Sequence, residues 1–215
     1  MKKTYITVAL LVLAAIAAAM AGAMSPAGNA SARNAITCAA TAGASPERAE
    51  DRMKDIDTEN LRDIYFAGGC FWGVEEYFSR IPGVYDVSSG YANGARENPT
   101  YKEVCSGTTG HAETVHVRYD PKIISLKSLA GQFFKIINPV SVNRQGNDVG
   151  SQYRTGMYSV RDEDRPVLEA VMNRVRKKFG KPLAVELTPL KNYYLAEEYH
   201  QDYPKKNPGG YSHLN

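Results

Sequence analysis

The sequence predicts an α+β fold in which a mixed sheet carries helices on its faces. Segments typical of strands, either apolar runs or strict alternations, are interspersed with segments whose apolar residues recur at helical spacing. The connections between them have both hairpin-like and crossover-like lengths, which is typical of α+β domains. With 215 residues, the chain is long enough for one domain with a proper core, but not for two of comfortable size.

The first predicted strand and helix enclose a reactive-looking cysteine. The apolar run 64–67 predicts a strand, and one helical face follows at Phe71, Val74, Phe78 and Ile81. Cys70 therefore lies where a strand ends and a helix begins, beside the pair Gly68-Gly69 that lets the backbone turn sharply. Because a helix N-terminus stabilises an anion, we expect the thiolate form of Cys70 to be favoured.

The remaining elements follow from periodicity and from residues that start or stop helices. Ser125 is expected to cap one helix, and Gly180 is expected to end another. We predict an extended segment over 85–91, strands over 114–119, 153–160 and 183–187, helices over 125–137, 162–179 and 195–203, and an irregular loop over 138–152.

The N-terminal part differs in kind from the rest. Lys2 and Lys3 precede a nearly charge-free, alanine-rich run, and small residues follow it, so residues 1–32 are predicted to be a secretory signal peptide. The competing interpretation is an uncleaved membrane anchor. Residues 33–60 lack a sustained apolar period and are predicted to be a flexible tether, and residues 61–215 are predicted to form the compact domain. We therefore expect an exported protein, periplasmic or extracellular.

Composition argues against several classes of function. The formal net charge is +3 and no basic stripe with interleaved aromatics is present, so nucleic acid is not an expected partner. The three cysteines, Cys38, Cys70 and Cys105, do not form a disulfide framework, and neither they nor the four histidines have the spacing of a metal site. We expect a monomer, and the cysteines and histidines offer no candidate metal site.

Two further clusters have polar side chains suited to chemistry. Glu113 opens the alternating strand, either as an exposed strand end or as a general acid whose pKa a partly desolvated position would raise. The loop 145–154 carries several hydrogen-bonding side chains just before a strand, as binding loops often do. Tyr101 and Tyr153 fit the core, the rim or a role as phenolic donors, and periodicity does not decide among these.

Four segments in order resemble the peptide methionine sulfoxide reductase A family. They are Gly-Cys-Phe-Trp-Gly at 69–73, Gly-His-Ala-Glu at 110–113, Gln-Gly-Asn-Asp-Val-Gly-Ser-Gln-Tyr-Arg at 145–154, and Tyr-His-Gln-Asp-Tyr at 199–203 followed by Asn-Pro-Gly-Gly-Tyr at 207–211. The resemblance covers about residues 63–211. It implies a two-layer α+β sandwich with a ferredoxin-like core. It also implies reduction of the S epimer of methionine sulfoxide, free or in oxidised proteins, with electrons from thioredoxin or another thiol, so that no cofactor and no metal is needed.

The resemblance also implies a role for each matching residue. Cys70 matches the nucleophile that becomes a sulfenic acid, and Glu113 matches the acid that protonates the sulfoxide oxygen. Tyr101 and Tyr153 match the phenols that orient the same oxygen. Phe71 and Trp72 match the apolar walls around the substrate methyl group, and Asp148 matches a polar pocket residue.

One departure from the family concerns recycling. Many members carry a resolving cysteine in the tail, where this chain has Ser212. Three accounts stay open: Cys38 on the tether resolves Cys70, an external thiol reduces the sulfenic acid directly, or Ser212 is an engineered replacement. Cys105 matches a position without a catalytic role and is expected to be structural.

Two other functions remain in competition at this point. One is a secreted cysteine hydrolase or acyltransferase, which needs a histidine base that only His111 offers near these motifs. The other is a non-catalytic module that grips methionine-rich surfaces with its aromatic pocket.

Overall fold

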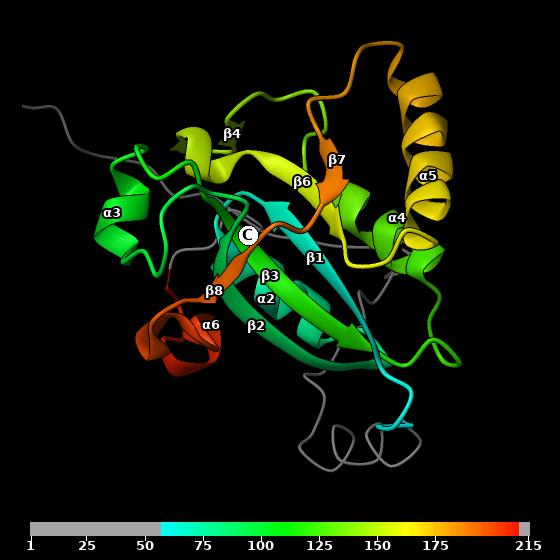
Figure 1. Cartoon of the computed structure of the whole chain (residues 1–215), viewed down its shortest axis with the longest axis horizontal. Helices are drawn as coiled ribbons and strands as arrows, with labels where there is room; N and C mark the ends of the chain where they lie inside the picture. The colour runs from blue at the N-terminus through cyan, green and yellow to red at the C-terminus, as the bar shows by residue number, and fades with distance from the viewer. Residues whose placement is uncertain (1–56, 211–215) are drawn as a thin grey trace, which may run out of the picture. The chain divides into compact units, whose positions relative to one another are not determined.

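The computed structural model describes residues 57–210, which form a six-stranded mixed sheet with helices packed against it (Figure 1). The strands of this sheet are β1 (Arg62–Gly68), β2 (Val84–Ala92), β3 (Ala112–Tyr119), β6 (Thr155–Ser159), β7 (Glu186–Pro189) and β8 (Tyr193–Leu195). The α-helices are α2 (Phe71–Ser79), α3 (Tyr101–Cys105), α4 (Leu126–Ile136), α5 (Asp164–Phe179) and α6 (Tyr203–Lys206). Two short strands, β4 (Arg144–Gln145) and β5 (Asp148–Val149), pair with each other.

The strand order confirms the predicted α+β class with its ferredoxin-like core. The sheet runs β7-β6-β1-β3-β2-β8. Its four inner strands are antiparallel, and α2 and α4 form the crossovers of a βαββαβ unit. Strand β7 adds to one edge in parallel and β8 adds to the other edge in antiparallel orientation, which makes the sheet mixed.

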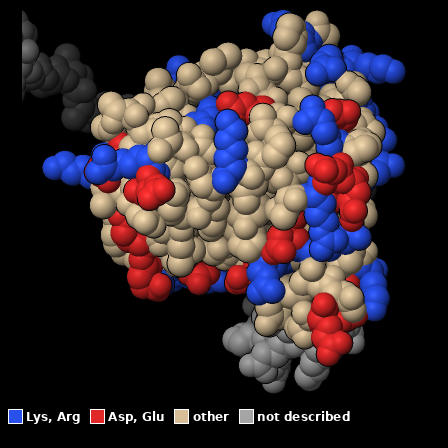
Figure 2. Space-filling view, viewed as in Figure 1, with Lys and Arg blue, Asp and Glu red and all other residues tan. Residues whose placement is uncertain are grey.

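The long helices cover one face of the sheet. Ile64 and Phe66 of β1 point into the main core, where they meet side chains of α2, α4 and α5 such as Phe78, Phe133 and Leu168. On the opposite face, Tyr65 packs with Tyr193, Tyr158 and small residues, and the connection from β7 to β8 crosses this face (Figure 1). Figure 2 shows that face to be largely uncharged, with basic and acidic side chains interspersed toward its rim.

The two largest differences from the sequence predictions concern the segment 195–203 and helix α3. The segment 195–203, predicted to be a helix, instead ends strand β8 and continues into a 3-10 turn, Glu198–His200. Pairing of Leu195 with Gly90 at the sheet edge replaces the helical hydrogen bonds. Helix α3 was not predicted, because five residues show no period. Its only sequence signal is the capping box formed by Thr100 and Glu103.

Several predictions fall on residues that the structure does not describe. The signal peptide over 1–32, most of the tether over 33–60, Cys38 and Ser212 all lie outside the described residues. The described end of the tether already contacts the domain, since the Asp57 N–H donates to Asp120 at 2.9 Å and the Asp57 carboxylate pairs with Lys122. Among residues 57–210, no helix is both long and apolar enough to cross a bilayer.

Candidate active site

Cys70 occupies the position that the sequence predicts, at the N-cap of α2. Gly69 precedes it with a φ of 88°, a conformation that glycine adopts without the strain a side chain would add, so the chain can turn from β1 into the helix. The cysteine side chain is 6% exposed, and it is not bonded to another cysteine. The backbone N–H groups of Trp72 and Gly73 hydrogen-bond toward its sulfur.

The expectation that the thiolate of Cys70 is favoured is wrong for the resting site. Burial raises the pKa of the Cys70 thiol, and the charge of Asp148 and the charge that Glu113 carries once it is ionised raise it further, while the N–H groups at the start of α2 only partly offset these effects. The helix N-terminus acts as the sequence indicates, but desolvation and two carboxylates from distant parts of the chain outweigh it. The resting sulfur is therefore a thiol at neutral pH.

Glu113 lies beside Cys70, and the structure rules out an exposed strand end. Glu113 is the second residue of β3 and is 1% exposed. Its carboxyl group accepts a hydrogen bond of 3.1 Å from the N–H of Phe71. Burial raises the pKa of Glu113 to about 8, although the Phe71 N–H works in the opposite direction. This carboxyl therefore holds a proton at neutral pH next to the thiol, as a general acid must.

Tyr101 and Tyr153 reach the same site from two different elements. Tyr101 is the first residue of α3, and Tyr153 ends the 3-10 turn Ser151–Tyr153 rather than beginning a strand. Burial raises the pKa of both phenols, and both also feel the negative charge of Glu113. Tyr153 additionally responds to the charge of Cys70, so both phenols lie within electrostatic reach of the reacting groups.

The remaining predicted residues surround this centre. Asp148, on β5, acts through its charge on Cys70, Glu113 and Tyr153, which places it near all three. Phe71 is 1% exposed and belongs to the main core, whereas Trp72 is only half-buried. Trp72 thus supplies the accessible aromatic surface, and Phe71 backs it from within.

Sequence reasoning missed two residues that support the site. The carboxylate of Glu197 accepts two hydrogen bonds, from the Tyr91 hydroxyl to Oε2 at 2.7 Å and from the Tyr101 N–H to Oε1 at 2.9 Å. His200 accepts a hydrogen bond of 3.0 Å from the indole N–H of Trp72. Both lie in or beside the motif at 199–203, which was recognised without a role being assigned to its histidine.

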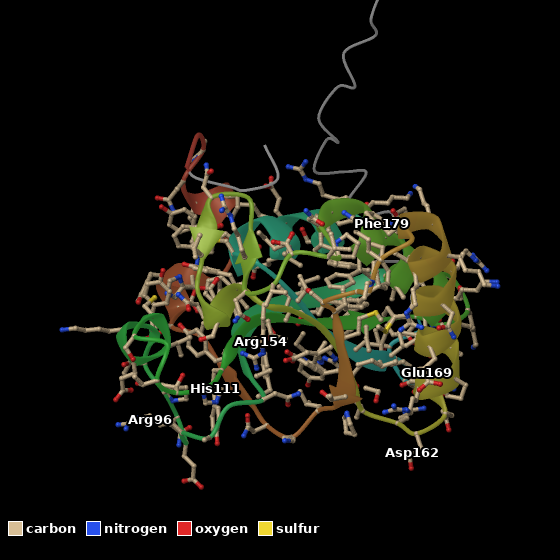
Figure 3. All side chains as sticks on the ribbon, turned by 90° about the horizontal axis from the view of Figure 1, so that it is seen from above. Arg96, His111, Arg154, Asp162, Glu169 and Phe179 are labelled. Atoms are coloured by element: carbon tan, nitrogen blue, oxygen red, sulfur yellow. The ribbon has the colours of Figure 1, made fainter. Side chains whose placement is uncertain are left out.

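His111, the only base available to a cysteine hydrolase near these motifs, does not pair with Cys70. Its ring is 1% exposed and packs beside Tyr194, and burial together with the charge of Arg154 lowers its pKa (Figure 3). In the part of the chain that the structure describes, the groups that perturb the thiol of Cys70 are carboxylates and backbone N–H groups rather than an imidazole. The arrangement fits oxygen protonation better than hydrolysis by a Cys–His pair.

Cys105 is closer to the site than its expected structural role implies. It ends α3 with an exposed thiol that is hydrogen-bonded to the Tyr101 phenol. No group of three or more His, Cys, Asp or Glu side chains within residues 57–210 is arranged to hold a metal ion.

The comparisons with known proteins agree with this geometry. A family model described as peptide methionine sulfoxide reductase matches residues 62–215. Proteins named peptide methionine sulfoxide reductase MsrA include one from Clostridium botulinum (strain Okra / Type B1), 54% identical over 154 residues that cover 72% of this chain and 98% of the relative. Another, from Clostridium tetani, is 52% identical over 155 residues, covering 72% of this chain and 94% of the relative.

Two solved structures are also similar. The reduced form of Mxr1 from Saccharomyces cerevisiae superposes with a TM-score of 0.69 at 39% identity, covering 73% of this chain and 91% of Mxr1. Methionine sulfoxide reductase A of Corynebacterium diphtheriae gives a TM-score of 0.65 at 36% identity, covering 71% of this chain and 77% of that one.

Proposed function

This chain belongs to the peptide methionine sulfoxide reductase family, and we propose that it reduces the S epimer of methionine sulfoxide through a sulfenic acid on Cys70. It is a thiol-dependent peptide-methionine (S)-S-oxide reductase. The observation that carries the proposed mechanism is the buried Glu113 carboxyl, bonded to the N–H that follows Cys70 and holding its proton at neutral pH.

In the proposed reaction, oxygen moves from the sulfur of the substrate to the sulfur of Cys70. The sulfur of Cys70 loses its thiol proton and bonds to the sulfoxide sulfur, while Glu113 gives its proton to the sulfoxide oxygen and the phenols of Tyr101 and Tyr153 orient that oxygen. The hydroxyl group then passes from the substrate sulfur to the sulfur of Cys70 as the S–O bond of the substrate and the new S–S bond break, so methionine leaves and Cys70 becomes a sulfenic acid. The proton released by the thiol replaces the one that Glu113 gave. Two external thiols then return Cys70 to the thiol, either directly or by reducing a disulfide that the sulfenic acid has first formed with a thiol of this chain, with release of water and of a disulfide of the external thiols.

The aromatic wall selects for the methyl group of the substrate. Trp72 offers a half-buried ring two residues after Cys70, and aromatic faces suit a polarisable sulfur and its methyl group. Free methionine sulfoxide and methionine sulfoxide in proteins both present this end, so we propose that both are substrates. The charge of Asp148 helps to hold the polar side of the pocket.

The test is methionine release from a methionine sulfoxide peptide in the presence of dithiothreitol, with Cys70→Ser as the matched control. We expect turnover by the parent and none by the variant, because a hydroxyl is far less nucleophilic than a thiolate at neutral pH. Binding without turnover by the parent would instead support a module that grips methionine side chains. Appreciable methionine production by Cys70→Ser would overturn the assignment of the nucleophile.

We also propose where the enzyme works and what reduces it. The leader over residues 1–32 supports export, with repair of oxidised exported proteins as the physiological task. Because Ser212 replaces the usual tail cysteine, reduction falls to a thioredoxin-like or other external thiol, with or without Cys38. Mass spectrometry of the mature protein after one turnover without reductant reports the N-terminus and any Cys38–Cys70 bond in one measurement.

A further inference from the structure

The outer face of helix α4 carries an open groove that the proposed reaction does not use. The groove has a volume of about 530 Å³ and runs along α4, with one side chain of α5 on its flank. Its lining combines three cations, Lys127, Lys135 and Arg174, with two serine hydroxyls, one amide and one glycine. Among the described residues that line the groove, none carries a carboxylate. The groove is therefore polar and positively charged.

The three cations of the groove lack counterions in the fold. Within residues 57–210, none of their side chains forms an ion pair or a hydrogen bond. Other cations nearby are paired, since Lys122 contacts Asp57 and Arg165 of α5 contacts Glu169. Like charges around one hollow repel one another, and an incoming anion relieves that repulsion while it gains their attraction.

The groove belongs to a larger basic surface on the same two helices. The stretches 125–137 and 170–181 cover α4 and the end of α5, and we call them the α4–α5 surface. They hold seven of the 26 Lys and Arg residues of the chain and none of the 23 Asp and Glu residues. Arg174, Lys177 and Lys178 recur at helical spacing, so they share one face of α5. The attraction for anions thus extends beyond the groove itself.

Gly131 forms part of the groove, and packing does not explain a glycine at this position. It lies inside α4, where glycine is less favourable than alanine. A Cβ at this position would meet no atom of the described residues within 4 Å beyond its own turn of helix. Lys127, Gly131 and Lys135 are spaced four residues apart, so the glycine lies between the two lysines on one face. The missing side chain therefore deepens the groove between two cations.

Two features of the α4–α5 surface favour a membrane over a protein partner or a soluble anion. Protein interfaces are rich in aromatic side chains and methionine, and the described lining of the groove has neither. Ammonium, guanidinium and hydroxyl groups are instead donors that suit phosphate oxygens. Phe179 is 42% exposed and follows Lys177 and Lys178 at the end of α5. Exposed aromatic rings beside lysines are typical of surfaces that enter the headgroup layer of a bilayer.

We propose that the α4–α5 surface docks on a bilayer that contains anionic phospholipid, with a headgroup phosphate in the groove and Phe179 in the headgroup layer. This binding goes beyond the reductase reaction and does not depend on it. In Figure 3, Glu169 and Phe179 of α5 lie on the opposite side of the view from His111 and Arg154, which belong to the site segments 110–113 and 145–154. A docked chain therefore keeps its active site free for substrate.

Co-sedimentation of the full chain with vesicles tests the proposal. The vesicles contain either phosphatidylcholine alone or equal parts of phosphatidylcholine and phosphatidylglycerol. We expect binding to the anionic vesicles to exceed binding to the neutral ones, and this excess to fall as salt is added. Any contribution of residues 1–32 is the same in the parent and in every variant, so it cancels in their comparison. Equal binding to both vesicles by the parent would overturn the proposal.

Two double variants of equal charge separate the groove from the net charge of the chain. Lys135→Gln with Arg174→Gln removes two cations of the groove, whereas Lys102→Gln with Lys191→Gln removes two exposed cations of other segments. For the groove pair we expect affinity for the anionic vesicles to fall about thirtyfold, about fivefold for each cation. For the control pair we expect affinity within about twofold of the parent. Equal losses in the two pairs would overturn the proposal.

Two single variants test the groove and the ring without a change in charge. Gly131→Ala should keep or raise the stability in urea unfolding, yet weaken binding to the anionic vesicles about fivefold, because its methyl group fills the floor of the groove. Phe179→Ser should also weaken vesicle binding. Parent-like vesicle affinity in either variant would overturn the assigned contacts.

Soluble anions distinguish a membrane from the other occupants of this surface. Calorimetry with glycerol 3-phosphate and with a glutamate-rich peptide should show much weaker binding than the anionic vesicles show, because neither probe engages Phe179 or the whole surface. Tighter binding of either probe would assign the surface to a soluble anion or an acidic protein and would overturn docking on a bilayer. None of these measurements needs turnover, so failure of the reductase function would leave their outcome unchanged.

Discussion

Replacing Glu113 by Gln should lower the rate of catalysis and should raise the stability of the fold relative to the parent as the pH increases. The carboxyl is 1% exposed and has a pKa raised by burial from 4.5 to about 8. The folded chain therefore binds one more proton than the unfolded chain between these two values. The stability associated with that proton is fully present below pH 4.5 and is lost as the pH rises through about 8.

The size of the effect follows from the shift itself. One pKa unit corresponds to about 1.4 kcal/mol, so the parent should lose roughly 3 kcal/mol of unfolding free energy between pH 5 and pH 7 relative to Glu113→Gln. Glutamine is neutral throughout, and its amide oxygen can still accept the Phe71 N–H. Glu75, whose pKa burial raises to about 7, is present in both proteins and cancels in the difference.

Urea unfolding followed by circular dichroism, at pH 5, 6, 7 and 8 for both proteins, measures this difference. In the same samples, kcat/KM of the parent should fall above about pH 8, and the variant should be about 100- to 10,000-fold slower at neutral pH. A stability difference that stays constant across these pH values would refute the raised pKa. Reduction at the parent rate by the variant would show that the proton comes from another group.

Three further expectations can be checked separately. Because the pKa of Cys70 is raised, its alkylation by iodoacetamide should be slow at pH 7, and the alkylation rate should still rise above pH 9. Glu113→Gln should change the alkylation rate at neutral pH far less than it changes turnover. An alkylation rate that levels off near pH 7 would contradict the buried thiol. Cys38→Ser should lose thioredoxin-driven turnover but keep dithiothreitol-driven turnover if Cys38 resolves the sulfenic acid, and equal activity with both reductants eliminates that role. Gly94→Ala should destabilise the fold by about 1–3 kcal/mol in urea unfolding, since its Cβ would overlap the buried ring of His111, and an unchanged midpoint would show that the ring moves aside without cost.

The sequence predicts most of the fold where the signal is local. The spacing of Phe71, Val74 and Phe78 gives α2, and the strict alternation over 114–119 gives most of β3. The segment 195–203 was mispredicted because its fate depends on a neighbour far away in the chain. Pairing of β8 with β2 overrides local preference, and Asp202 takes a left-handed conformation with a φ of 52°.

The same distinction applies to the site. The resemblance identifies Cys70 and Glu113, and the structure brings them together through the N–H of Phe71. The protonation state of the thiol could not be predicted, because its main determinants are burial and a carboxylate 43 positions later in the sequence. The supporting role of Glu197 has no local signal either, since its partners come from β2 and α3.

The segment that holds Trp72 and Tyr101 in place also fixes the order in which the molecule can mature. During synthesis the strands and helices of the ferredoxin-like core emerge first, and domains begin to fold from the N-terminus as they are made. The contacts of Trp72 with His200 and of Tyr101 with Glu197 span 128 and 96 positions, so they close only after Glu197 and His200 have left the ribosome. A nascent chain, or one clipped before Glu197, can thus carry a nearly complete sheet and still lack the contacts that hold Trp72 and Tyr101.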